Sequence, residues 1–374
     1  MSEQKIILAD NNYAELDKYI KGSSCKSIML VCDESLKFLN IKNYFDSLED
    51  RRNVNLTRFS SFKPNPLYES VVEGVELFHQ NRCDMIIAVG GGSALDVAKC
   101  IKLYSNMDDS QNYLKQRIIP NDIPFLAVPT TAGTGSEATR YAVIYFNGEK
   151  QSVTDSSCIP SVVLMDPSVL KTLPEYQKKS TMLDAFCHAV ESFWSVNSTE
   201  ESREYSRAAI QLILKNKDAY LDNEESGNAE MLRAANIAGK AINITQTTAG
   251  HAMCYKLTSI YGIAHGHAAA LCVSKLFPFM VNHTNQCIDP RGEDFLKTIF
   301  GEIADVMGCK NADAACRKFN EIFDSLNLSV PVAAEVDFEI LKNSVNPIRL
   351  KNNPVSLEMD DIDLLYHQIL TERK

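Results

Sequence analysis

The sequence predicts two domains, an N-terminal α/β domain built on a parallel sheet and an all-α C-terminal domain. In the first part, short apolar runs alternate with stretches of helical periodicity, the pattern of a parallel sheet flanked by helices. After Asp166-Pro167, strand-like runs become rare and long helical periodicities follow one another. A chain of 374 residues also exceeds what one hydrophobic core usually organises. We therefore place the α/β domain at residues 1–167 and the helical domain at residues 168–374.

The expected elements follow from residue spacing. Apolar runs predict strands at Ser27–Cys32, Asn55–Phe59, Met85–Val89, Phe125–Val128, Ala142–Phe146 and Ser161–Met165. Apolar residues at three-to-four spacing predict helices of the first domain at Ser70–Gln80 and Ala94–Tyr104. The same spacing predicts helices of the second domain at Leu183–Trp194, Glu200–Lys215, Ala229–Ile244, Ala268–Val281, Phe295–Met307 and Asp313–Leu326.

Composition and charge exclude several classes of protein. The net charge of -10 and the pI near 5.3 argue against a nucleic-acid partner, because neutralising phosphates requires a basic surface. No apolar run reaches the length of a membrane span, and the start MSEQKIILADNN lacks the features of a signal peptide. The eleven cysteines are scattered, odd in number and free of CxxC spacing, which favours reduced thiols. We expect a cytoplasmic protein with a small-molecule partner, neither membrane-bound nor bound to nucleic acid.

Two polar loops follow strands of the first domain and suit a phosphate ligand. Gly90-Gly91-Gly92-Ser93 lies between a strand and a helix, where glycines allow close approach and free helix N–H groups attract anions. The loop Pro129–Glu137 offers four hydroxyls and two glycines as hydrogen-bonding groups. Each loop has a simpler reading, as a tight turn without ligand or as a capped helix start. Neither matches the usual dinucleotide or P-loop fingerprint.

Asp33 follows the strand Ser27–Cys32 directly. An acidic side chain there can accept hydrogen bonds from an adenosine ribose and repel a 2′-phosphate, which favours NAD(H) over NADP(H). A simple helix cap is equally compatible with the sequence.

A metal site is indicated by one carboxylate and several histidines. Asp184 and His188 are four residues apart, so a helix places both on one face. His251, His265 and His267 cluster downstream, whereas only three other histidines occur in the chain. Such a set suits Fe(II), Zn(II) or Mn(II) with a position open for a substrate oxygen. Any one of these histidines alone would more often be a hydrogen-bonded core residue. His267 is the weaker ligand candidate, and we expect it to lie behind the metal ligands or to face the cofactor.

Together these motifs resemble the iron-containing (group III) alcohol dehydrogenase family. The matching segments, in the family's order, are KPNP (Lys63–Pro66), GGGSALDVAK (Gly90–Lys99), PTTAGTGSEAT (Pro129–Thr139), DAFCHAVE (Asp184–Glu191) and GHAM…IAHGHA (Gly250–Ala268). The resemblance implies a dehydroquinate synthase-like fold, with an N-terminal Rossmann-like domain, a C-terminal helical domain, and cofactor and metal in the cleft between them. It also implies NAD(H), one divalent metal and a homodimer.

The resemblance assigns site residues one by one. Those expected at the dinucleotide are Asp33, Gly91, Gly92, Ser93, Asp96, Thr130, Thr131, Ser136 and Lys150. The expected metal ligands are Asp184, His188, His251 and His265. Two departures stand out: Tyr255 replaces a further histidine that many members have, and Met182-Leu183 replaces the glycine usually found before the ligand Asp184. The role of that histidine therefore does not carry over, and the second change is expected to affect only local helix packing.

A narrower resemblance concerns the substrate. The segments around residues 191–209 and 240–271 resemble the phosphonoacetaldehyde reductase branch of the family. An aldehyde with a phosphonate or sulfonate needs cations and hydroxyl donors near the metal. These two segments supply Arg203, Lys240, Lys256, Ser195, Asn197, Ser198, Thr199, Thr245, Thr247 and Thr248, of which Arg203, Lys240, Thr247 and Lys256 are our substrate candidates. Solvated helix residues and a threonine cap explain them equally well.

The expected reaction is reduction of an aldehyde by NADH. The metal, held by His251 and His265 among others, polarises the carbonyl and the nicotinamide supplies hydride. The proton comes from water, ribose hydroxyls, Tyr255 or His267. The alternatives are a short-chain alcohol or diol dehydrogenase, a sulfoacetaldehyde reductase, a non-redox relative such as a dehydroquinate synthase, and a non-catalytic metal or nucleotide sensor.

Overall fold

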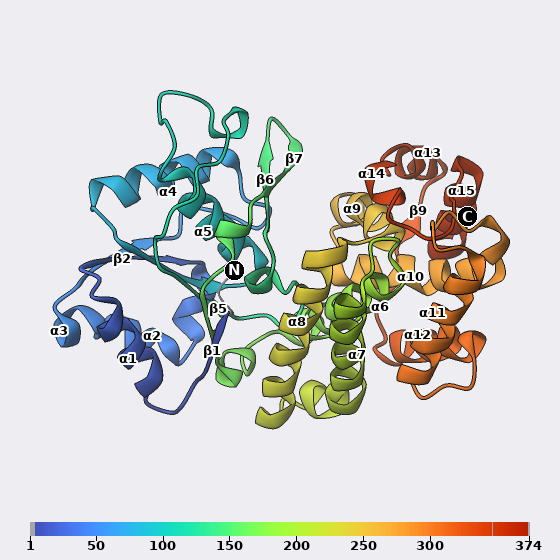
Figure 1. Cartoon of the computed structure of the whole chain (residues 1–374), viewed down its shortest axis with the longest axis horizontal. Coiled ribbons are helices and arrows are strands. Elements are labelled where there is room, and N and C mark those ends of the chain that lie inside the picture. The colour runs from blue at the N-terminus through green and yellow to red at the C-terminus, as the bar shows by residue number, and fades with distance from the viewer. Residues whose placement is uncertain (1–3, 346, 373–374) are drawn as a thin grey trace. The chain divides into compact units, whose positions relative to one another are not determined.

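The computed structural model describes residues 4–345 and 347–372, which form two compact units. The first unit comprises the described residues up to Leu173 together with Asp222–Asn236, and the second comprises Pro174–Leu221 and the described residues from Ile237 onward (Figure 1). The helix α8 (Glu225–Thr245) therefore contributes residues to both units. The predicted division into domains at residues 1–167 and 168–374 stays a prediction.

The first unit is organised by a six-stranded parallel sheet. Its order is β1-β8-β5-β4-β2-β3, and each pairing is parallel. The strands are β1 (Lys5–Leu8), β2 (Ser27–Cys32), β3 (Asn55–Phe59), β4 (Met85–Gly90), β5 (Phe125–Pro129) and β8 (Val162–Met165). All residues of β2, β4, β5 and β8 are buried, as expected for strands covered on both faces.

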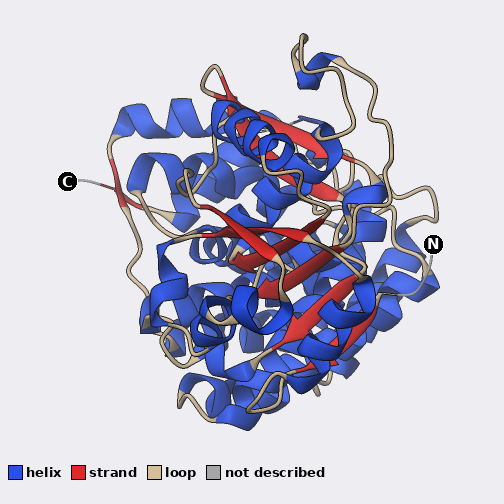
Figure 2. Cartoon of the chain, turned by 90° about the vertical axis from the view of Figure 1, so that its left-hand side faces the viewer, coloured by secondary structure: helices blue, strands red, loops and turns tan. Residues whose placement is uncertain are grey.

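Helices cover the sheet and connect its strands (Figure 2). They are α1 (Ala14–Ser23), α2 (Ile41–Asp46), α3 (Leu48–Arg52), α4 (Tyr68–Gln80) and α5 (Gly92–Tyr104). The two helices predicted in this part are confirmed as α4 and α5, each beginning two residues earlier than expected. Because the strands are parallel, the loops after β2, β4 and β5 all leave the same edge of the sheet.

One predicted strand belongs to a different sheet. Residues 142–146 do form a strand, β6 (Tyr141–Phe146), but it pairs antiparallel with β7 (Glu149–Thr154) in a two-stranded ribbon outside the parallel sheet. Asn147 and Gly148 connect the two strands with φ of 52° and 77°, the left-handed geometry of a tight hairpin turn. The predicted strand is therefore confirmed, but it lies outside the parallel sheet because a two-residue Asn-Gly turn returns the chain antiparallel.

The second unit is predominantly helical, which confirms the expected helical C-terminal region apart from one short pair of strands. The six helices predicted there are observed as α6 (Glu175–Trp194), α7 (Glu200–Leu221), α8, α10 (His265–Asn282), α11 (Glu293–Val306) and α12 (Ala312–Ser325). The elements not predicted there are α9 (Ala249–Tyr261), α13 (Glu335–Asn343), α14 (Pro347–Leu350), α15 (Met359–Ile369) and the short parallel pair β9 (Val332–Ala333) and β10 (Thr371–Glu372). Trp194, Phe277 and Phe300 pack together in its core.

Two further expectations concern thiols and membranes. All eleven cysteines carry free thiols, eight of them buried. None of the helices within residues 4–345 and 347–372 combines the length and apolarity that a bilayer span requires.

Candidate metal centre and phosphate-binding loops

Three of the four predicted metal ligands meet in the second unit. Helix α6 presents Asp184 and His188 on one face, and α9 brings His251 against them. One potential ligand atom from each of the three residues lies within 4.8 Å of the others. Nε2 of His251 is 3.4 Å from Asp184 Oδ1, and Nε2 of His188 is 3.9 Å from the same oxygen. The two imidazoles stack with ring centroids 4.5 Å apart, and both Nε2 atoms lie within 4 Å of that carboxylate oxygen.

His265 lies beside this cluster at the start of α10. Its ring centroid is 5.4 Å from that of His251, and the ring of Tyr255 stacks against it at 5.4 Å. The next residue, Gly266, allows the approach: a Cβ there would lie 2.6 Å from Asp184 Cβ and 2.9 Å from its backbone nitrogen. A glycine is therefore needed where α10 crosses α6.

The electrostatics of the cluster fit a cation. Asp184, His188 and His251 are 2%, 5% and 1% exposed. Burial alone raises the pKa of Asp184, but the surrounding imidazoles, with His188 contributing most, hold it below its ordinary value. Burial lowers the pKa of His251, yet Glu191 and Asp184 together raise it to about 10. A buried carboxylate among imidazoles requires compensating positive charge.

The donor set matches a divalent transition metal. Imidazole nitrogens and one carboxylate oxygen are ligands that Fe(II), Zn(II) and Mn(II) accept. Asp184, His188 and His251 thus fit the metal expected from the sequence. The fourth candidate, His265, is only partly buried and lies beside them.

His267 and Tyr255 occupy different surroundings. Nδ1 of His267 is 3.1 Å from the hydroxyl of Tyr176, and its ring lies 6.1 Å from that of Phe323. Its Nε2 is buried without a hydrogen-bond partner in the described part of the chain. Burial lowers the pKa of His267 to about 4, so the ring is neutral at physiological pH. Tyr255, by contrast, lies directly against His265.

The two predicted phosphate loops lie side by side in the first unit. A Cβ on Gly91 would lie 3.3 Å from Thr131 Cγ2, and one on Gly92 would lie 3.1 Å from Thr134 Cγ2. The N-cap residue of α5 is Gly91, which has no side chain to cap the helix, and the first turn carries no acidic residue. The first N–H groups of α5 are therefore available to an anion.

The remaining cofactor candidates surround these loops. Oδ1 of Asp33 accepts the Ser35 N–H at 2.8 Å, while its Oδ2 lies 3.3 Å from where a Cβ on Gly90 would be. Ser136 donates to Asp96 and accepts from the buried Lys99. These hydrogen bonds join protein groups to one another, so they stabilise the fold in addition to any role in binding a ligand. Thr130 donates its backbone N–H to the Gly90 carbonyl, and Ser93 is the second residue of α5. Lys150 lies on β7, and its positive charge opposes the rise that burial causes in the pKa of Asp96.

Burial remains the largest influence on the carboxyl group of Asp96. It raises the pKa despite the opposing effect of Lys99.

The substrate candidates are dispersed within the second unit. Thr247 precedes α9, and its hydroxyl accepts a hydrogen bond from Arg349 at 2.8 Å. Arg203 stacks over Phe295 at 5.7 Å, and Lys240 and Lys256 are half-buried on α8 and α9. Some of the candidate hydroxyls donate hydrogen bonds to backbone carbonyls: Ser195 donates to that of Thr245, and Thr245 to that of Ala241. Sequence reasoning missed Arg349, a cation joined to Thr247 across 102 residues.

Glu191 was also missed, although it lies in a quoted motif. Its side chain is fully buried and reaches the ring of His251 at 2.6 Å. Its spacing of seven residues from Asp184, two helical turns, was the available signal.

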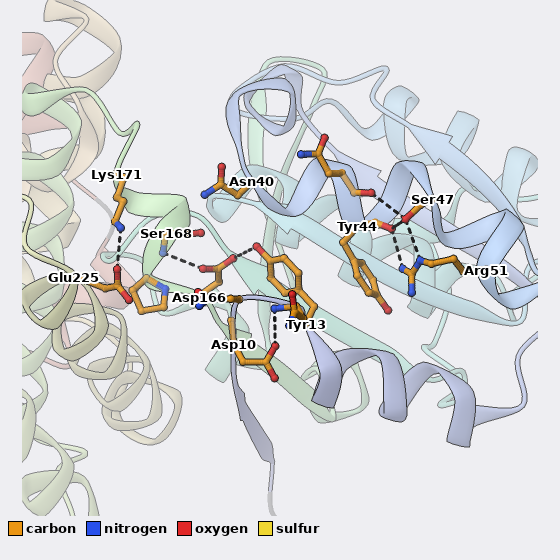
Figure 3. A pocket seen from close by; sticks show the side chains of 15 residues that line it. Asp10, Tyr13, Asn40, Tyr44, Ser47, Arg51, Asp166, Ser168, Lys171 and Glu225 are labelled. Carbon is orange, nitrogen blue, oxygen red and sulfur yellow. Dashed lines mark hydrogen bonds and ion pairs between the residues drawn. The ribbon is translucent and has the colours of Figure 1, made fainter.

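A polar pocket of about 620 Å³ opens in the first unit at the carboxyl ends of β1 and β8 (Figure 3). Its charged groups largely neutralise one another. Lys171 pairs with Glu225 at 2.8 Å, and Tyr13 donates to Asp166 at 2.7 Å. None of the predicted site residues lines it, and we assign no ligand to it.

Comparisons with known proteins agree with the motifs. The family model described as iron-containing alcohol dehydrogenase matches residues 3–167, and that of the C-terminal part of the same family matches residues 178–370. The phosphonoacetaldehyde reductase of Streptomyces viridochromogenes is 31% identical over 76% of this chain and 75% of its own length. Alcohol dehydrogenase 4 of Schizosaccharomyces pombe is 27% identical over 94% and 84%.

A solved structure extends the similarity to three dimensions. The sulfoacetaldehyde reductase of Bifidobacterium kashiwanohense, in complex with NAD⁺, is 27% identical with a TM-score of 0.82, covering 98% of this chain and 96% of its own. The predicted α/β-plus-α fold is confirmed.

Proposed function

Because the chain belongs to the iron-containing alcohol dehydrogenase family, we propose that it reduces a small aldehyde with an anionic head group, using a metal held by Asp184, His188, His251 and His265. The oxidoreductase class, an NAD-linked interconversion of aldehyde and alcohol, follows from the family and its named relatives. The observation that carries the metal-dependent reaction is the buried convergence of Asp184, His188 and His251.

In this proposal the chain's own residues bind and orient. The metal, Fe(II), Zn(II) or Mn(II), would supply a Lewis acid that polarises the aldehyde carbonyl, and the reduced nicotinamide would supply hydride. Asp184 provides the negative charge that the three imidazoles lack. The Gly91-Gly92-Ser93 turn, the start of α5 and the hydroxyls of Thr130 and Thr131 hold the pyrophosphate.

The remaining residues are proposed to support the cofactor-binding loop or to donate the proton. Asp96, Ser136 and Lys150 support the second loop. Tyr255 is the better-placed proton donor of the two candidates, since it stacks on His265, whereas His267 bonds to Tyr176. We also propose a cytoplasmic homodimer.

We propose NAD(H) rather than NADP(H) because of the charge on Asp33. Replacing Asp33 by asparagine keeps the shape and the oxygen that caps the helix at Ser35 but removes the charge that repels a 2′-phosphate. The ratio of kcat/KM for NADPH over NADH is expected to rise at least about tenfold, equivalent to about 1.4 kcal/mol. Steady-state assays with both cofactors measure it. An unchanged ratio would mean that Asp33 serves only as a cap.

An anionic substrate is supported by two observations. The named activities of two relatives concern aldehydes with a phosphonate or a sulfonate. In this chain the half-buried Arg349 donates to Thr247, which lies four residues before His251. A guanidinium with a neighbouring hydroxyl is suited to a tetrahedral oxyanion. We propose that Arg349 and Thr247 bind the head group, and that Arg203, Lys240 and Lys256 contribute to the local positive charge.

A substrate panel tests this proposal. The metal-loaded enzyme is assayed through NADH absorbance with phosphonoacetaldehyde, sulfoacetaldehyde, propionaldehyde and butyraldehyde. We expect kcat/KM at least about tenfold higher for one anionic aldehyde. Replacing Arg349 by methionine, of similar length but uncharged, should lower that value about 100-fold, or about 2.7 kcal/mol, and leave the neutral aldehydes within about twofold.

The results separate the alternatives. Equal turnover of neutral aldehydes by the wild type would favour a general alcohol or diol dehydrogenase. If Arg349→Met still preferred anionic aldehydes, Arg349 would not bind the head group, but the proposed substrate class would stand.

A further inference from the structure

A carboxylate that the proposed reaction does not use lies behind the candidate metal centre. Glu191 is fully buried on α6 and shares one helical face with Asp184 and His188. Its Oε2 is 2.6 Å from Nδ1 of His251, while the opposite nitrogen, Nε2, is 3.4 Å from Asp184 Oδ1. The imidazole of His251 therefore lies between two carboxylates, and its Nε2 faces the other ligands.

The same carboxylate fixes the main chain that carries His251. The backbone N–H of Thr248 donates to Oε2 at 3.1 Å, and that of His251 donates to Oε1 at 3.0 Å. These amides belong to the start of α9, where N–H groups lack acceptors within the helix and the helix dipole favours a negative charge. Glu191 thus holds both the ring and the backbone of His251.

Gly250 leaves the space that this arrangement needs. A Cβ on residue 250 would overlap Oε1 of Glu191 and lie 2.6 Å from Cγ2 of Val273 on α10. The start of α9 can approach α6 this closely only with glycine at that position.

We propose that Glu191 is a positioning residue for the metal, accepting the Nδ1–H of His251 so that the Nε2 lone pair is directed at the ion. A carboxylate on the far nitrogen of a ligating histidine fixes its tautomer and ring orientation and increases its basicity as a ligand. The inference rests on the metal site of the proposed function and extends it to a residue that contacts neither metal nor substrate.

The test measures metal affinity and needs neither cofactor nor aldehyde. The full chain is stripped of metal, and its Kd for Zn(II) is determined by competition with a chromophoric chelator. Glu191→Gln keeps the size of the side chain but sets an amide N–H against the donors that the carboxylate accepts. We expect its Kd to be about 10- to 100-fold higher than that of the wild type. The Co(II) absorption spectrum should shift as well, because the ring of His251 is no longer held in one orientation.

Trp194→Phe is the matched control. Nε1 of Trp194 donates to Thr248 Oγ1 at 3.0 Å, so this side chain also ties the start of α9 to α6 but does not reach the ring of His251. Its Zn(II) affinity should stay within about twofold of the wild type, with an unchanged Co(II) spectrum. An equal loss in Trp194→Phe and Glu191→Gln would overturn the inference, because the contact would then be structural only.

Two further variants complete the design. Glu191→Asp retains the charge one methylene further back and should show an intermediate Kd; a wild-type Kd in this variant or in Glu191→Gln overturns the inference. Asp184→Ala tests the site itself. If that variant binds Zn(II) as tightly as the wild type, the proposed metal site fails, an outcome distinct from failure at Glu191.

Discussion

Replacing Asp184 by alanine is expected to lower kcat/KM for aldehyde reduction at least about 1000-fold, or about 4 kcal/mol of transition-state stabilisation. The reason is charge as well as geometry. Oδ1 of Asp184 lies 3.9 Å from Nε2 of His188 and 3.4 Å from Nε2 of His251, so this carboxylate oxygen faces both rings. Without it, the doubly charged ion would lose the carboxylate that faces it directly, and much of the compensation for its charge in a buried site.

The measurement combines kinetics with metal content. NADH oxidation is followed in metal-supplemented buffer, and bound metal is determined after gel filtration. Glu175→Gln is the control: it changes an exposed carboxylate on the same helix, paired with Lys179, and should leave kcat/KM within about twofold. Activity of Asp184→Ala within tenfold of the wild type would show that the cluster is not the catalytic metal site.

Replacing Gly266 by alanine is expected to destabilise the protein by about 3 kcal/mol or more, although alanine is the better helix former by about 1 kcal/mol. The added Cβ would overlap the carbonyl oxygen of Ser180 and lie 2.6 Å from Asp184 Cβ. The carbonyl is backbone of α6, so relief requires α6 and α10 to separate. That movement would also displace His265 from Asp184, and we expect metal affinity to fall with stability.

Gly301→Ala provides a control with the opposite sign. Gly301 lies in α11, and its hypothetical Cβ has no atom within 4 Å beyond its chain neighbours and the adjoining backbone of its own helix, so alanine there should stabilise by about 0.5–1 kcal/mol. Urea unfolding of both variants, with and without Zn(II), gives the comparison. Wild-type stability of Gly266→Ala would mean that the helix crossing is more adaptable than the structure indicates.

The strands of the parallel sheet were predictable because burial on both faces leaves little but apolar residues. Ser27–Cys32 is observed with the expected bounds, and β4 and β5 each extend one residue beyond theirs. The edge strand Asn55–Phe59 also has the expected bounds, although only Phe59 in it is buried. The edge strand β1 was missed, since it has four residues and buries only Ile7. The hairpin of β6 and β7 cannot be recognised from the apolar run of β6 alone. The feature that indicates it is the Asn147-Gly148 pair, which favours a two-residue hairpin turn.

The metal ligands were accessible from sequence because Asp184 and His188 share a helical face and the histidines recur nearby. The supporting residues differ in this respect. Glu191 continues the same periodicity and could have been found, whereas Arg349 reaches Thr247 only through folding. The close approach at Gly266 depends on how α10 crosses α6, which no local pattern encodes.

The location of the candidate ligands has a consequence for how the protein loses its structure. Asp184 and His251 are separated by 67 residues of chain and lie on different helices of one unit. An ion bound to both acts as a cross-link that restricts the unfolded chain, much as a disulfide does, and stabilises only the state in which these helices are docked. Chelation would thus loosen the helical unit itself, and slow metal loss during purification would show as a falling melting temperature before any proteolysis.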